Sequence, residues 1–326
     1  MPITGDMGVL FRAAAGPRVG FGHLARCRAL ARALGVRPIV SLRGSAGTAR
    51  AAGALGVRVA PRGVTALARP GLRLLVVDDP DARAARIWVA AARRRGVPVA
   101  VVRDASPRAL GADLVIDGSV RTHADERPGR CLGPRFAVLD PRLPAIRARR
   151  RAPRRGPIVV ALGGGAHVFP HVGAVVRALA SRVPAADIRV APGFTARVRP
   201  TLPGARWVPP ARLAAALAAA RVAIVAGGLT AQEACALGVP AVAVAVVPAQ
   251  RPAIRAMAAR GAVVDAGSLG ARGSAARVAD AAARLLTTPS ARRRMAVAGR
   301  GLVDGRGAAR VAAALVALAA GGGAHA

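Results

Sequence analysis

Residues 222–247 read VAIVAGGLTAQEACALGVPAVAVAVV, and they contain the clearest pattern of secondary structure in the chain. The apolar run at 222–225 predicts a buried strand, Gly227 and Gly228 predict a turn, and residues 230–237 predict a helix. A second apolar run at 239–247 predicts another buried strand. Strand, helix and strand in this order form the βαβ unit of a parallel sheet that is covered on both faces.

The same alternation continues on both sides of this stretch. In the second half, strands are predicted at 157–162, 188–191 and 206–208, with helices from about residue 171 and over 213–220 and 252–260. In the first half, strands are predicted at 8–13, 38–42, 72–78, 97–103 and 114–117. The clearest helix there begins at His23, with its apolar residues on one face, and ends before Gly35.

The alternation pauses over residues 119–156. This segment shows no sustained period, and its Arg- and Pro-rich end, 147–155, predicts an interdomain linker. We therefore predict two doubly wound α/β domains, residues 1–152 and residues 153–326. Ligands of such sheets bind beyond the carboxyl ends of the strands, so we expect the substrate in the cleft between the domains.

Arginine dominates the charge. The chain has 326 residues and a formal net charge of +35, and all 50 basic residues are Arg, whereas Lys, Asn and Tyr are absent. Residues 1–152 carry 28 Arg and 10 acids, and residues 153–326 carry 22 and 5. The charge is thus spread evenly, whereas a nucleic-acid-binding arm would concentrate it. This composition indicates a GC-rich genome and favours no nucleic-acid partner; the 53% apolar content excludes disorder for most of the chain.

The cysteines and the apolar runs predict a soluble cytoplasmic protein. Cys27, Cys131 and Cys235 lie about a hundred residues apart, which is neither metal-ligand nor disulfide-framework spacing. The beginning of the chain lacks the pattern of a signal peptide. The longest apolar runs reach about half of the ~20 residues that a membrane span requires. We predict neither a metal nor a cofactor.

His23 is the leading candidate for chemistry in the first half. It follows a glycine-containing loop that includes Gly20 and Gly22, and it stands where a helix is predicted to begin. The partial positive charge of a helix N-terminus disfavours imidazolium, and a neutral His suits a general base. A capping or solvent-facing His explains the position equally well. Asp78 ends a predicted strand at the same edge, where it would position a substrate hydroxyl or a water.

The second half offers two glycine turns after strands. Gly163, Gly164 and Gly165 follow the first strand and suit a diphosphate, although a plain turn would look the same. In the second turn, Thr230 and Glu233 have the spacing of a capping box. Glu233 either caps its helix or accepts hydrogen bonds from a ribose diol.

Several of these residues resemble a known family. Val9-Leu10-Phe11-Arg12-Ala13 and Gly20-Phe21-Gly22-His23-Leu24-Ala25-Arg26-Cys27 resemble the opening of the UDP-sugar hydrolases of pseudaminic acid biosynthesis and of related spore-coat polysaccharide proteins. The resemblance continues to the block at 227–240. The second half also resembles the nucleotide-binding half of the peptidoglycan N-acetylglucosaminyltransferase.

The resemblance implies a GT-B fold, in which the C-terminal domain holds UDP and the N-terminal domain faces the sugar. It implies that His23 is the general base for attack by water on the anomeric carbon of a UDP-linked diacetamido-trideoxy sugar, with UDP leaving. It further implies that Glu233 binds ribose and that Gln250 approaches the sugar or the phosphates. The remaining substrate-binding positions that it implies are Arg12, Gly20, Gly22, Gly163, Gly164, Gly165, Gly227, Gly228, Leu229, Thr230 and Gln232.

Three functions therefore stay open. The first is a UDP-sugar hydrolase. The second is a glycosyltransferase of the same fold that uses a sugar acceptor in place of water. The third, of another class, is a non-catalytic protein that binds anions or nucleic acid through its arginines.

Overall fold

The computed structural model describes residues 8–16, 19–104, 110–151, 153, 155–163, 168–192 and 201–321. The chain divides into two compact units. Unit 1 comprises residues 1–141 and 306–326, and unit 2 comprises residues 142–305. Each unit is a parallel sheet with helices on both faces, as the sequence predicts.

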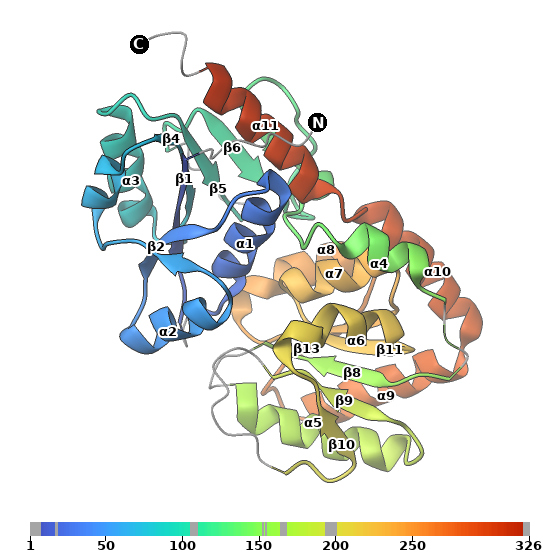
Figure 1. Ribbon diagram of the computed structural model, residues 1–326. Helices are drawn as coiled ribbons and strands as arrows, with labels where there is room; N and C mark the ends of the chain where they lie inside the picture. Colours follow the sequence, from blue (N-terminus) through green and yellow to red (C-terminus); the bar gives the residue numbers. More distant parts are fainter. Residues whose placement is uncertain are drawn as a thin grey trace. The chain divides into compact units, whose positions relative to one another are not determined.

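Unit 1 contains, within its described residues, a seven-stranded sheet of order β3-β2-β1-β4-β5-β6-β7 (Figure 1). Its strands are β1 (Gly8–Ala14), β2 (Ile39–Arg43), β3 (Arg58–Val59), β4 (Leu72–Asp78), β5 (Val99–Val102), β6 (Leu114–Asp117) and β7 (Arg130–Leu132). Its helices are α1 (Gly22–Leu34), α2 (Ala46–Ala54), α3 (Ala82–Arg93) and α11 (Gly307–Gly321), with short 3-10 turns η1 (Val64–Ala68) and η2 (Pro134–Phe136).

The order of the strands explains where the helices of unit 1 lie. The β1–α1–β2 and β4–α3–β5 crossovers run in opposite directions along the sheet, so right-handed connections place α1 and α3 on opposite faces. Alternate strand residues follow this division, because Leu10, Leu75 and Val77 are buried in one cluster with Trp88 of α3. Strand ends β1, β2, β4 and β5 therefore share one edge, which carries the polar side chains described below.

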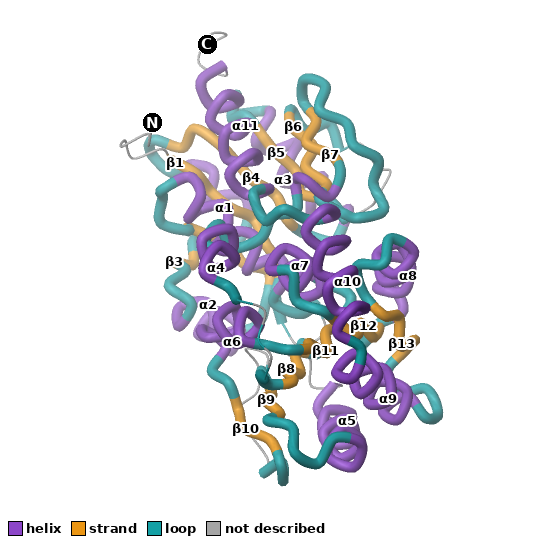
Figure 2. The backbone as a smooth tube through the Cα atoms, turned by 90° about the vertical axis from the view of Figure 1, so that its right-hand side faces the viewer, coloured by secondary structure: helices purple, strands orange, loops and turns teal. Residues whose placement is uncertain are grey.

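Unit 2 contains, in the part that the structure describes, a six-stranded sheet of order β10-β9-β8-β11-β12-β13. Its strands are β8 (Ile158–Ala161), β9 (Ile188–Val190), β10 (Ala205–Trp207), β11 (Val222–Ala226), β12 (Ala241–Ala245) and β13 (Val264–Ser268). Its helices are α4 (Leu143–Arg149), α5 (Phe169–Arg182), α6 (Leu213–Ala219), α7 (Leu229–Leu237), α8 (Arg251–Ala259), α9 (Ser274–Thr287) and α10 (Pro289–Leu302), with η4 (Pro210–Arg212) and η5 (Pro248–Gln250). Helices α5 and α9 lie together on one face of this sheet, and α10 packs on α7 (Figure 2).

The last helix differs from the sequence expectation that the second domain runs from 153 to 326. Helix α11 packs on α1 and therefore belongs to unit 1. Helix α11 also lies close to η2, since a Cβ at Gly307 would collide with the backbone of Ala137, the C-cap of η2. Arg310 adds a hydrogen bond from its Nη1 to the carbonyl oxygen of Arg135, at 2.8 Å.

The expected linker at 147–155 was also wrong in its first part. Residues Leu143–Arg149 form α4, which packs on α6 and α7 within unit 2. Arg147 donates from Nη1 to the carbonyl oxygen of Asp304 at 3.0 Å, and Arg150 donates from Nη2 to that of Ala220, the C-cap of α6, at 3.1 Å. Carbonyl groups at helix ends lack backbone donors, so guanidinium groups bind there. Arg147 and Arg150 of the basic run are therefore packing residues. Strand β7 and η2 also lie in the segment where no period is visible.

Candidate functional site

The loop between β1 and α1 places His23 at the edge of the unit 1 sheet. Gly16 and Gly20 pair through two backbone hydrogen bonds, and Gly20 has a φ of 81°, a conformation that suits glycine. Phe21 is the N-cap of α1, Gly22 is its first residue and His23 its second. The expected helix start is thus confirmed to within a residue, and the ring of His23 reaches the end of β4.

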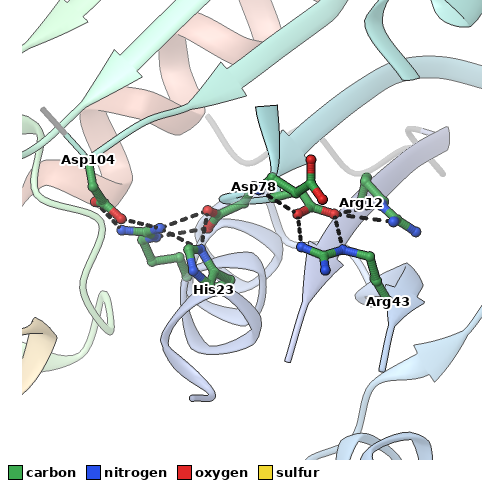
Figure 3. A network of polar contacts seen from close by, with 8 residues as sticks. Arg12, His23, Arg43, Asp78 and Asp104 are labelled. Carbon is green, nitrogen blue, oxygen red and sulfur yellow. Dashed lines mark hydrogen bonds and ion pairs between the residues drawn. The ribbon is translucent and has the colours of Figure 1, made fainter. Parts of the chain in front are cut away.

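His23 and Asp78 meet in a hydrogen bond. Nδ1 of His23 lies 2.7 Å from Oδ1 of Asp78, and the His23 side chain is 14% exposed (Figure 3). Arg26, one helical turn after His23, completes the cluster. Its Nε and Nη2 donate to the two oxygens of Asp78 at 2.8 and 2.7 Å, and its Nη1 and Nη2 donate to those of Asp104 at 2.6 and 3.0 Å.

The hydrogen-bond count assigns the tautomer of His23. Nη2 of Arg26 lies 2.8 Å from Nδ1 of His23, but the two hydrogens of Nη2 are directed to Asp78 and Asp104. Nδ1 therefore carries a hydrogen and donates it to Asp78, and Nε2 is left with a lone pair. This is the form of histidine that accepts a proton from a substrate.

Charge favours the ionised forms of the groups around His23. Burial alone would raise the pKa of Asp78, but the charges and hydrogen bonds of Arg26 and His23 lower it below its ordinary value. Burial opposes the charge of Arg26, yet Asp78 and Asp104 raise its pKa well above the ordinary value. Asp78 is thus a carboxylate that can stabilise a positive charge on the neighbouring ring.

A second ion cluster lies on the next residue of the chain. Asp79 is buried and accepts hydrogen bonds from Nε of Arg12 at 3.2 Å, from Arg43 at the end of β2, and from the backbone nitrogen of Asp81 at 3.0 Å. The guanidinium of Arg12 also lies 5.1 Å from the ring centroid of Trp88. The structure therefore engages Arg12, expected to bind substrate, in an ion pair with Asp79. Asp81 is the N-cap of α3 and accepts from the backbone nitrogens of Arg83 and Ala84.

A small cavity adjoins His23 and Asp78. Its volume is about 150 Å³, and its lining includes His23, Arg26, Asp78, Asp79, Arg103 and Asp104. The lining also includes the apolar side chains of Val101 and Leu110. Such a hollow admits a small polar group beside the imidazole ring.

In unit 2, the start of α7 corrects the expected capping box. Gly228 is the N-cap, and no side chain caps the helix, so Thr230 is the second helical residue and Glu233 the fifth. A capping box requires residues at the N-cap and at the third position, which Thr230 and Glu233 do not occupy. The helix begins earlier because Gly228 takes the non-helical conformation and its carbonyl accepts from the backbone nitrogen of Ala231. Leu229, Thr230, Gln232 and Glu233 all lie on this helix and are partly exposed.

Gln250 lies beside this helix start. Its Oε1 accepts a hydrogen bond from the backbone nitrogen of Val246 at 2.9 Å. A Cβ at Gly228 would lie 3.8 Å from Nε2 of Gln250, and one at Gly227 would lie 2.5 Å from Cγ1 of Ile254. The structure thus brings Gln250 and the two glycines together, with amide donors at an uncapped helix N-terminus. Such an arrangement suits an anion.

The other glycine turn is described only at its start. Gly163 follows β8 with a φ of 91° and an exposed surface. Gly164 and Gly165, which were expected to face a diphosphate, lie outside the described residues. Among the described side chains, no three of His, Cys, Asp or Glu gather as a metal ion would need. No described helix has the length and apolar character of a membrane span.

Sequence reasoning missed three residues of the site. Arg26 was part of the quoted motif but carried no expected role, and Asp104 and Arg43 were not selected. Asp104 had the same signal as Asp78, an acid just after a predicted strand, and β4 and β5 are neighbours in the sheet. Only the pairing of the strands shows that the two carboxylates share one guanidinium.

Comparisons with known proteins bear on the fold. No family model and no curated protein matches the chain. Similar solved structures include the spinosyn rhamnosyltransferase SpnG complexed with thymidine diphosphate, which is 19% identical with a TM-score of 0.65 over 95% of this chain and 99% of that chain. The spinosyn forosaminyltransferase SpnP is 18% identical, with a TM-score of 0.65 over 97% and 100%. MurG from Acinetobacter baumannii is 15% identical, with a TM-score of 0.60 over 95% and 99%.

At these identities the likeness speaks for the fold alone. It extends over nearly the full length of both chains in each comparison, and it agrees with the two parallel-sheet units. The predicted fold is confirmed: this chain has the GT-B fold.

Proposed function

We propose that this protein transfers a glycosyl group from a nucleoside diphosphate sugar to an acceptor hydroxyl. The observation that carries the proposal is the 2.7 Å hydrogen bond between His23 and Asp78 in a cavity at the carboxyl edge of the unit 1 sheet. Nε2 of His23 removes the proton of the acceptor as its oxygen bonds to the anomeric carbon. The bond from that carbon to the diphosphate oxygen breaks, and the nucleoside diphosphate leaves.

Asp78 makes this proton transfer easier. The imidazolium that forms carries a positive charge next to a buried carboxylate that is already ionised. The same hydrogen bond fixes the ring orientation, so that Nε2 is the nitrogen available to the acceptor. His23 and Asp78, both selected from the sequence, are therefore proposed as the catalytic pair, with Asp78 orienting His23 where the sequence suggested that it positions a substrate hydroxyl or a water.

We assign the donor nucleotide to unit 2. The amide groups at the start of α7, with Gly228 as an exposed N-cap and Nε2 of Gln250 close by, suit the diphosphate. Glu233 on the same helix suits the ribose diol, and the turn that begins at Gly163 suits the remaining phosphate oxygens. The description of SpnG as complexed with thymidine diphosphate supports a pyrimidine nucleoside diphosphate, UDP or TDP.

The acceptor distinguishes two candidate functions. Similarity to structures described as glycosyltransferases favours a hydroxyl acceptor. The Gly20-Phe21-Gly22-His23 element with Arg26-Cys27 instead favours water, which would make the protein a hydrolase of the pseudaminic-acid type. We place transfer first and hydrolysis second. Both use the same base and leaving group, and both suit a cytoplasmic enzyme.

One incubation separates them. The purified protein is mixed with a panel of UDP-, TDP-, GDP- and CMP-sugars, with and without candidate acceptors, and the nucleotide and free sugar are followed by NMR. Release that requires an acceptor supports transfer, and free sugar without an acceptor supports hydrolysis. If no sugar nucleotide is consumed under either condition, the proposal is wrong.

Two pairs of variants test the assigned roles. His23→Ala should abolish turnover and retain nucleotide binding, whereas the matched control His123→Ala, an exposed His in a loop of unit 1, should leave both unchanged. In Gly228→Ala the new Cβ would lie 3.8 Å from Nε2 of Gln250, an ordinary contact distance, so the fold should be retained. The same methyl group would stand at the helix start where the diphosphate is proposed to bind, so nucleotide binding should weaken. Full activity of His23→Ala would exclude the proposed base.

A further inference from the structure

Arg26 joins two carboxylates that come from neighbouring strands. Its side chain is 9% exposed, Asp78 ends β4, and Asp104 lies two residues after β5. Each carboxylate receives two N–H groups of the guanidinium, at distances between 2.6 and 3.0 Å. The planar fork of arginine matches such paired acceptors. The base proposed above uses only Asp78, so Arg26 and Asp104 need a separate explanation.

Asp104 decides where the hydrogens of Arg26 go. Nη2 of Arg26 is 2.7 Å from Asp78, 3.0 Å from Asp104 and 2.8 Å from Nδ1 of His23, and it has two hydrogens for these three neighbours. Without Asp104 one hydrogen is released and can be donated to Nδ1. Nδ1 would then be an acceptor, its own hydrogen would move to Nε2, and the nitrogen that faces the substrate would no longer accept a proton.

Asp104 also balances the charge of the cluster. With a neutral ring, Asp78, Asp104 and Arg26 sum to a charge of −1, and when His23 takes a proton the sum becomes zero. Without Asp104 the same step would leave a positive charge. The other charged groups that line this cavity are Asp79, which Arg12 and Arg43 already engage, and Arg103.

We propose that Arg26 and Asp104 are positioning residues, which hold the proton of His23 on Nδ1 and let Nε2 take up a second one. The proposal rests on the proposed function, because the position of the proton on His23 matters for catalysis only if His23 is the base. It concerns the state of the ring, however, and this can be measured without any substrate.

Asp104 acts mainly through its hydrogen bonds. Its side chain is 61% exposed, so water screens the interaction of its charge with the ring strongly. Its carboxylate, however, accepts from Nη1 and Nη2 of Arg26 at 2.6 and 3.0 Å, and the second of these bonds uses a hydrogen that would otherwise be available to Nδ1 of His23.

The experiment uses Asp104→Ala and Asp104→Asn in the full chain. Nitrogen-15 NMR of the imidazole rings reports the tautomer. The chain has five His, so the signal that His23→Gln removes is assigned directly to His23. The control is Glu126→Ala, an exposed carboxylate of unit 1 that pairs with Arg135. It changes the net charge equally and touches nothing in the cluster.

The expected result is a ring with Nδ1 protonated in the unmodified protein and in Glu126→Ala. In Asp104→Ala the proton should move toward Nε2, whereas Asp104→Asn, which keeps an acceptor oxygen, should hold the proton on Nδ1. With substrate, kcat should fall in Asp104→Ala, while KM for the donor stays constant.

An unchanged tautomer in Asp104→Ala would overturn the inference, whatever the activity. If the proton moves to Nε2 but the unmodified protein consumes no sugar nucleotide, the inference stands and the proposed function fails. If the protein turns over and Asp104→Ala changes KM alone, Asp104 binds substrate and does not position the ring.

Discussion

Asp79→Ala tests how the sheet edge next to the site is held together. Asp79 is fully buried in its side chain and holds both Arg12, itself buried, and Arg43, which is 39% exposed. In this variant the guanidinium of Arg12 still lies against Trp88, but the carboxylate of Asp79 that pairs with it is gone. Leaving a buried charge unpaired costs about 3–5 kcal/mol, and we expect unit 1 to lose about that much stability.

Two further variants give this number its meaning. Arg43→Ala removes the exposed partner of the same carboxylate and should cost about 1 kcal/mol or less, because water screens that pair. The double variant Arg12→Met, Asp79→Leu removes both buried charges and keeps the volume, so it should be clearly more stable than Asp79→Ala. The loss in Asp79→Ala would then come from the stranded charge.

Tryptophan fluorescence during urea unfolding measures these differences. Trp88 lies in α3 of unit 1 and Trp207 in β10 of unit 2, and the chain has no other Trp, so a Trp207→Phe background reports unit 1 alone. The change in unfolding free energy follows from the midpoint and slope of the transition. Equal losses of less than about 1 kcal/mol in Asp79→Ala and Arg43→Ala would refute the reasoning.

Three other outcomes follow from the structure. Because the pKa of Asp78 is lowered in the folded protein, its ionisation stabilises the fold above the unfolded pKa of about 3.9, and this stabilisation is lost as the pH falls through the lower folded pKa. The difference in urea midpoint between the unmodified protein and Asp78→Asn should therefore disappear in acid. A difference that stays constant with pH would contradict this. Burial raises the pKa of Cys235 to about 12, and all three cysteines are buried. A thiol reagent at pH 8 should therefore label the three cysteines only after the protein is unfolded, and rapid labelling of the folded protein would contradict this prediction. Gly227→Ala would bring a Cβ to 2.5 Å from Cγ1 of Ile254 and should destabilise unit 2 by about 1–3 kcal/mol. The fluorescence of Trp207 during urea unfolding measures this loss in a Trp88→Phe background, and Gly228→Ala is the control.

Most strands were predictable because they are apolar runs bounded by glycine, proline and aspartate. Strands β3, β7 and β13 were not predicted, because the first two have only two and three residues and β13 reads Val-Asp-Ala-Gly-Ser, without an apolar run. The helix that begins near His23 was predictable, since its apolar period ends at Gly35, which has a φ of 71° as a left-handed C-cap. The segment 119–156 was not, because Arg147 of α4 and its C-cap Arg150 donate to the carbonyl groups of Asp304 and Ala220, and no local period records such distant partners.

The residues of the site also fall into those that the sequence could predict and those that it could not. His23 and Asp78 could be selected from sequence because each stands at a helix start or a strand end, and such positions meet at one edge of a parallel sheet. Thr230 and Glu233 were selected by a spacing rule, and the rule failed because the glycine pair lets the helix begin at Leu229. Arg26 could not be given its role, because a residue on the inner face of a helix is indistinguishable from a packed one until its two carboxylates are in place.

The clusters at this edge also change what the net charge of +35 means for function. Asp78, Asp104 and Arg26 sum to −1 around a neutral His23, and Asp79 with Arg12 and Arg43 sums to +1. These groups cancel, and Arg103, which also lines the cavity, leaves a sum of +1 beside the proposed base. The excess of arginine can raise the rate at which an anionic donor arrives, because long-range fields steer diffusion. The hydrogen-bond partners of His23, however, are set by the few acids that the sequence places at the ends of two adjacent strands.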